Sequence, residues 1–117
     1  MNTHLFLTFA CSTTISCLSP ASDPSIDING DALYGLCTDY DRVTDSSACL
    51  GYITGIENVM ARGDAVGGQR ACPKKPVDER QLLSIVRDYL REDGDQGVYP
   101  ASSLVASALA QAFPCRR

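Results

Sequence analysis

The sequence predicts an all-α domain, a small bundle of four main helices that two disulfides hold together. Three observations lead to this fold class. Four segments carry apolar residues at the three- and four-residue spacing of a helix. No segment alternates between apolar and polar residues for long enough to indicate a sheet. Beyond the first 21 residues the chain has an even number of cysteines, which is typical of small exported domains with disulfides.

The composition is that of one globular domain with a modest core, because the chain has 117 residues, of which 44% are hydrophobic and 21% charged. Ten Lys and Arg against fourteen Asp and Glu give a net charge of −4. An acidic chain repels phosphate backbones, so nucleic-acid binding is disfavoured. The acidic excess would attract a basic protein partner, although an acidic face exposed to solvent is the commoner explanation of such an excess.

Residues 1–21 are predicted to be a secretory signal peptide, which leaves 22–117 as the folded domain. The run from Leu5 to Leu18 is uncharged and apolar to small-polar, and Ser19 and Ala21 fit the cleavage rule for a cut after Ala21. The run is too short and too rich in hydroxyl groups for a spanning helix. We therefore expect export, with no membrane attachment once the signal is removed.

The first helix is predicted from about Gly30 to Tyr40, with Asn29 as its N-cap. The oxygen-bearing side chains just before it, at Asp27, Asn29 and Asp31, are also how a calcium loop begins. Such a loop needs glycine at its sixth position and glutamate at its twelfth, and this chain has alanine and threonine there. We interpret these residues as a leader and a helix cap, and expect no metal.

The second helix is predicted from about Ala48 to Arg62, with Ser46 or Ser47 as its cap. Gly51 and Gly55 lie four residues apart on it and leave bare backbone on one side. Two interpretations stay open: another helix approaches closely there, or the glycines are merely tolerated at roughly 1 kcal/mol each.

The stretch from Gly63 to Pro76 is rich in glycine and proline, so we expect a mobile loop anchored by Cys72. Asp78 is predicted to cap the third helix, which the stretch from Arg91 to Gly97 ends. The fourth helix is predicted from about Pro100 to Phe113 and has the most regular apolar pattern in the chain. Its predicted buried positions are Ala101, Leu104, Val105, Ala108, Leu109 and Ala112.

This order of helices predicts the disulfides. Cys37 ends the first helix and Cys49 opens the second, so a helical hairpin brings them together. Cys72 precedes the third helix and Cys115 follows the fourth, so their sulfurs meet if those helices are antiparallel. A zinc site would favour close cysteine pairs, which this chain lacks. We therefore expect the pairs Cys37–Cys49 and Cys72–Cys115.

Catalysis is disfavoured, and we expect no cofactor. The single histidine, His4, lies in the predicted signal, so the mature domain has no histidine to activate a nucleophile. The neighbouring carboxylates Glu92 and Asp93 lie in a polar turn with nothing apolar to raise a pKa.

Four motifs resemble those of the Rap/Tai family of type VI secretion immunity proteins. They are "GDALYGLC" (Gly30 to Cys37), "CLGYITGIENV" (Cys49 to Val59), "ACPKKPVDERQLLSIVRDYL" (Ala71 to Leu90) and "LVASALAQAFPC" (Leu104 to Cys115). The third block departs from the family pattern, because Pro73 follows Cys72 directly. The resemblance implies a small, helical, periplasmic protein, often a homodimer, that binds a cell-wall amidase or similar toxin and plugs its active-site groove.

The matched motifs fall mostly on core, cap and cysteine positions, so the inhibitory contacts are expected elsewhere. Two connections are candidates: the acidic turn from Arg91 to Tyr99, and the glycine-rich segment from Gly63 to Arg70. For each, an ordinary solvated connection is the alternative. The predicted partner-binding residues are Glu92, Asp93, Asp95, Gln96 and Tyr99. As a whole, the chain has one alternative function, that of a periplasmic helical protein with a stress, chaperone or accessory role.

Overall fold

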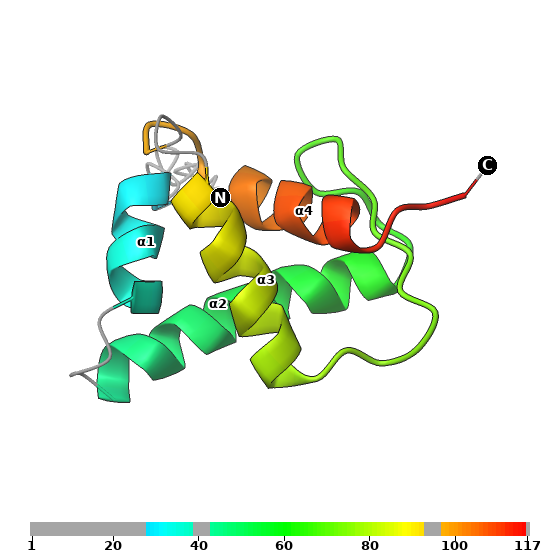
Figure 1. Cartoon of the computed structure of the whole chain (residues 1–117). Helices are drawn as coiled ribbons and strands as arrows, with labels where there is room; N and C mark the ends of the chain where they lie inside the picture. Colours follow the sequence, from blue (N-terminus) through cyan, green and yellow to red (C-terminus); the bar gives the residue numbers. More distant parts are fainter. Residues whose placement is uncertain (1–27, 39–42, 93–96, 117) are drawn as a thin grey trace, which may run out of the picture.

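A computed structural model describes residues 28–38, 43–92 and 97–116 of the chain. In these residues the backbone forms four helices and no strand (Figure 1). The helices are α1 (Gly30–Thr38), α2 (Val43–Ala61), α3 (Glu79–Glu92) and α4 (Ala101–Ala112). The predicted all-α class is confirmed. None of the described helices is long and apolar enough to cross a membrane.

Helix α4 contributes more buried residues to the core than any other described helix, and each of the four helices contacts the other three (Figure 1). Its twelve residues include no charged side chain, and half of them are buried. Fully burying a leucine or valine side chain contributes about 1.5–3 kcal/mol, so a helix enclosed on several sides is a main source of stability. The buried residues of α4 are Ala101, Leu104, Val105, Ala106, Ala108 and Leu109.

The other helices each turn one apolar stripe toward the same core. Their buried residues are Leu33 and Cys37 of α1, Cys49, Ile53 and Met60 of α2, and Leu82, Val86 and Leu90 of α3. These residues follow the helical spacing of apolar residues on which the fold class was predicted. Ala112 was expected in the core and is exposed, because it borders a hollow open to solvent.

Two predicted helix caps are confirmed. The Asn29 side-chain oxygen accepts a hydrogen bond from the backbone N–H of Ala32 at 3.0 Å, at the start of α1. The Asp78 carboxylate accepts one from the backbone N–H of Arg80 at 3.1 Å, at the start of α3. Helix α4 begins one residue later than predicted, because Pro100 has an extended ψ of 133° and is its N-cap.

Helix α2 begins at Val43, so the prediction that Ser46 or Ser47 caps it is wrong. No glycine or proline lies between Asp39 and Cys49, so nothing in this polar stretch stops a helix from extending toward its N-terminus. Gly51 and Gly55 are exposed, and a Cβ added to either would meet no atom of the described residues within 4 Å. Within the chain, these two glycines are therefore tolerated positions and not points of close helix approach.

Both predicted disulfides are present. Cys37 and Cys49 join the C-terminal turn of α1 to α2, with their Cα atoms 5.1 Å apart. Cys72 and Cys115 join the segment before α3 to the segment after α4, with their Cα atoms 4.9 Å apart. Near the first bridge, the Arg87 guanidinium on α3 donates a hydrogen bond to the carbonyl of Cys37, so α3 also holds the end of α1.

The glycine-rich segment forms a defined turn where a mobile loop was expected. Val66 and Gln69 exchange two backbone hydrogen bonds, at 3.0 and 2.9 Å, around Gly67 and Gly68. Both glycines have positive φ, 54° and 76°, as a tight two-residue hairpin turn requires. The Arg70 guanidinium donates to the carbonyl of Gly63 and closes the base of the turn. We call residues 66–69 the hairpin.

Candidate partner-binding surface

The predicted contact residues fall at the junction between α3 and α4. Asp93, Asp95 and Gln96 lie outside the described residues. Glu92 is the last residue of α3 and is exposed. Tyr99 lies just before α4, with 56% of its surface exposed. We call residues 97–100 the connection.

Backbone hydrogen bonds fix the connection against the start of α1. The N–H of Gly30 donates to the carbonyl of Tyr99 at 2.9 Å, and the N–H of Asp31 donates to the carbonyl of Gly97 at 3.2 Å. In the opposite direction, the N–H of Ala101 donates to the carbonyl of Ile28 at 2.8 Å. The connection is therefore held like a short piece of antiparallel ladder, although it lies in an all-helical protein.

Gly97 lets the connection pass close to α1. A Cβ at this position would lie 2.1–2.5 Å from the carboxylate atoms of Asp31. Any larger residue would therefore push that carboxylate aside. The glycine and the ladder together determine where the next two side chains point.

The large apolar side chains that the structure leaves exposed come from α1 and from the connection paired with it. Among the described residues they are Tyr34 at 42%, Val98 at 83% and Tyr99 at 56% exposure. Tyr34 lies on α1, and the other two lie on the connection paired with α1. Large exposed aromatic and aliphatic groups that are close together are typical of protein-binding sites.

The sequence analysis named Tyr99 alone of these three. Val98 is part of the same predicted turn, but its exposure follows from the direction in which the ladder holds it. Tyr34 lies outside the stripe formed by Leu33, Leu36 and Cys37. Its exposure could have been predicted from this position, because a large apolar residue outside the buried stripe faces solvent.

The structure brings the second predicted region to the same part of α4. A Cβ on Gly67 of the hairpin would lie 2.8 Å from the Ser103 hydroxyl oxygen and 3.2 Å from its Cα. Ser103 in turn lines a shallow hollow of about 240 Å³ together with Tyr99, Tyr89, Leu104 and Ser107. Figure 1 shows the hairpin and the connection on the same side of α4. We call the connection, Ser103 and the hairpin together the connection–hairpin surface.

The side chains of this surface are of the kinds that bind another macromolecule. Among the residues the structure describes, no three His, Cys, Asp or Glu side chains gather as metal ligands. The surface offers two exposed apolar side chains, hydroxyl groups and, at Glu92, a carboxylate. Such a set suits binding to another macromolecule.

A scan against family models decides the family. The model of the Rap1a immunity proteins matches residues 29–115, from the N-cap of α1 to the last cysteine. The chain belongs to this family. A search of curated proteins and a search of solved structures each found no match.

Membership identifies the chain as an immunity protein, whose expected partner is a toxin protein. The match covers all four helices and both disulfides, so the resemblance seen in the sequence extends over the whole described fold. In this Rap1a immunity protein the motif residues Cys49 and Ile53 are fully buried. They build the helical core, whereas the connection–hairpin surface lies outside that core.

Proposed function

We propose that the protein is a periplasmic immunity protein that blocks a type VI secretion toxin by binding over its active-site groove. The toxin is a cell-wall amidase or a similar enzyme. Family membership supports the toxin-binding role. The observation that carries the mode of binding is the pair of exposed side chains, Val98 and Tyr99, on a connection fixed by backbone hydrogen bonds to α1.

A connection whose backbone is already fixed loses little conformational entropy when it binds, which favours tight inhibition. Fixing the backbone of a flexible loop on binding costs about 1–2 kcal/mol for each residue. The ladder to residues 28–31 is already formed in the free protein, so less of this cost remains. Val98 and Tyr99 are then the anchors that enter the groove of the toxin.

The acidic residues around the connection favour a toxin whose groove has a basic rim. Glu92 ends α3, and Asp93 and Asp95 follow it in sequence. Charges at the edge of an interface mainly raise the association rate. They therefore contribute to how fast the toxin is captured, while the apolar pair contributes to how long it stays bound.

Export places this protein where such a toxin acts. Residues 1–21 have the pattern of a signal peptide, and disulfides persist in an oxidising compartment such as the periplasm. Mass spectrometry of the protein recovered from the periplasm tests this part. A mature chain that begins at Ser22 is expected, and a cytosolic protein that retains residues 1–21 would contradict it.

The inhibitory surface is tested with a toxin that this protein neutralises. The double variant Val98→Ala/Tyr99→Ala should weaken toxin binding by about 100-fold, mainly through faster dissociation, since buried interface anchors are each worth about 1–2 kcal/mol or more. Surface plasmon resonance gives both rates. Equilibrium unfolding in urea checks that the variant remains folded.

A charge series separates the two contributions. Glu92→Gln/Asp93→Asn/Asp95→Asn should slow association several-fold and leave dissociation nearly unchanged. Glu79→Gln, an exposed acidic residue in the first turn of α3, is the matched control and should change neither rate. Wild-type kinetics in both the apolar and the charge variants would remove the connection from the interface. The homodimer implied by the family resemblance stays a prediction, which sedimentation of the free protein tests.

A further inference from the structure

A second hollow lies at the other end of α4 from the connection, with a volume of about 380 Å³. Its charged side chains are all basic: Lys74 and Lys75 from the segment before α3, and Arg116 from the segment after α4. No acidic residue lines it, and Glu57 lines an adjoining hollow that shares Lys74, Lys75 and Val77. The lining of this hollow is therefore basic, although the chain has a net charge of −4. We call it the basic hollow.

The two chain segments that form the basic hollow are fastened together. The Cys72–Cys115 disulfide joins them across 43 residues of sequence, and the N–H of Cys72 donates to the carbonyl of Phe113 at 2.8 Å. Lysines from one segment and an arginine from the other are thereby held around one space. The disulfide and the hydrogen bond therefore hold the two segments that carry these basic residues next to each other.

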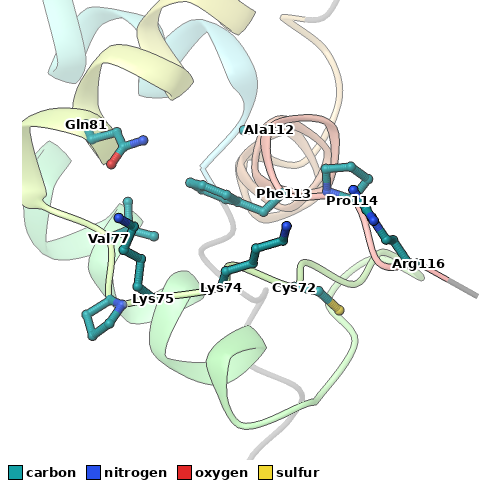
Figure 2. A pocket seen from close by; sticks show the side chains of 10 residues that line it. Cys72, Lys74, Lys75, Val77, Gln81, Ala112, Phe113, Pro114 and Arg116 are labelled. Carbon is teal, nitrogen blue, oxygen red and sulfur yellow. The ribbon is translucent and has the colours of Figure 1, made fainter.

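Between these cations the hollow has an apolar wall. Val77 and Phe113 are half-buried there, and Pro114 lies beside them. Figure 2 shows the Phe113 ring extending from the end of α4 toward Val77 and Gln81, with the Lys74 side chain reaching toward Phe113. An aromatic face next to ammonium groups accepts an apolar side chain that has carboxylates close by.

The cations have their charge available for a ligand. One ion pair joins Arg91 to Asp88 on α3, away from the hollow. Lys74, Lys75 and Arg116 are exposed, and none of them forms an ion pair with a carboxylate of the described residues.

We infer that the basic hollow binds a short acidic segment of a protein partner, an extended stretch with carboxylates on either side of one apolar side chain. The carboxylates meet Lys74, Lys75 and Arg116, and the apolar side chain lies against Phe113 and Val77. This site is separate from the connection–hairpin surface, and the inference does not depend on the proposed inhibition of a toxin.

The negative net charge of the chain favours a short acidic segment over a larger anion as the ligand of the basic hollow. A membrane surface or a nucleic acid presents many charges over a wide area, so it would also meet the acidic remainder of this chain, which repels it. A segment of a few residues enters the hollow alone. Beyond about 8 Å at physiological salt, the acidic charges elsewhere on the protein are screened from it.

The test uses two synthetic peptides with a fluorescent label and the purified protein with both disulfides formed. The acidic peptide is Glu-Asp-Leu-Glu-Asp and its neutral match is Gln-Asn-Leu-Gln-Asn. Fluorescence anisotropy should show binding of the acidic peptide only, and the binding should weaken as salt is raised. Replacing the central leucine by serine should lower the affinity several-fold, because the apolar wall then loses its contact.

Protein variants assign the binding to the hollow. Lys74→Gln/Lys75→Gln should weaken acidic-peptide binding about five- to tenfold, as expected for two exposed ion pairs. Arg62→Gln/Arg80→Gln removes the same charge from outside the hollow and should leave the affinity within about twofold. Circular dichroism of both variants should match that of the wild type.

Three results would overturn the inference. The first is equal binding of the acidic and the neutral peptide. The second is binding to vesicles containing phosphatidylglycerol without binding to the acidic peptide. The third is self-association of the protein that Lys74→Gln/Lys75→Gln abolishes, because the occupant would then be a second copy of this chain.

Discussion

The two disulfides mark two sides of the molecule that are built differently. On the α1 side, Cys37 and Cys49 are 1% and 0% exposed and form part of the core. On the C-terminal side, Cys72 and Cys115 are both exposed and join two segments that lie outside the helices. The same covalent bond is thus used once inside the packed helices and once as a clamp on the surface.

This difference separates two physical effects that a disulfide can have. Closing a loop lowers the entropy of the unfolded chain, and the estimate is about 3 kcal/mol for the short loop and about 4 kcal/mol for the long one. Packing adds to stability only where the sulfurs are buried. Loop length therefore favours the surface bridge, and burial favours the core bridge.

The largest effect is expected from removing the core bridge. Cys37→Ala/Cys49→Ala should lower the free energy of unfolding by about 5 kcal/mol, of which about 3 kcal/mol is loop entropy and the rest lost packing in the core. Equilibrium unfolding in urea measures it. In a domain with a stability of roughly 5–15 kcal/mol, this loss is about a third of the total or more.

Removing the surface bridge should cost somewhat less. Cys72→Ala/Cys115→Ala loses about 4 kcal/mol of loop entropy and almost no packing, because both side chains are exposed. The same urea experiment gives the value. A larger loss here than in the core variant would show that loop length outweighs burial, which would reverse the comparison.

A smaller loss of stability is expected from a substitution in the hairpin, which precedes Cys72 in the sequence. Gly67→Ala should destabilise the protein by about 1–2 kcal/mol, because its φ of 54° is strained for alanine and its Cβ would press on Ser103. Gly68→Ala is the matched control, since it has a similar φ of 76° but open space around it. Thermal unfolding of the pair isolates the Ser103 contact, and equal losses would mean that the hairpin does not press on α4.

The smallest effect is expected on the α1 side, at the connection. Gly97→Ala should cost about 0.5 kcal/mol, because the Asp31 carboxylate can rotate away but then leaves the favourable N-terminus of α1. In an Asp31→Ala background the same change should cost nearly nothing. A cost that persists in that background would mean that the backbone, and not the carboxylate, limits the space.

Much of the fold was predictable from local sequence patterns. The buried stripes follow from apolar spacing, and the caps at Asn29 and Asp78 follow from residue type. The disulfides follow from the order of helices and cysteines, because Cys37 and Cys49 lie on either side of the link between α1 and α2, and Cys72 and Cys115 lie before α3 and after α4. Helix α2 was predicted too short at its N-terminus. The polar stretch there has no glycine or proline to stop a helix, but it also lacks the apolar spacing from which a helix is predicted.

The surfaces were less predictable, because they depend on residues distant in sequence. The contact of Gly67 with Ser103 placed two separate candidate regions side by side, and no local pattern shows such a contact. The exposure of Val98 depends on hydrogen bonds between the connection and residues 28–31. The basic hollow likewise needs Lys74 and Arg116 to meet across the long disulfide loop.

The uncharged helix α4 has a consequence for the order of events in the cell. Because α4 follows the three helices that it contacts, a chain that emerges from a ribosome or a translocation channel exposes its apolar stripes until residues 101–112 arrive. Cys37 and Cys49 are both available early, whereas Cys72 has to wait for Cys115. The chain therefore completes its core only in one late step, which suits the proposed export, because a chain that has not yet folded can pass through a translocation channel.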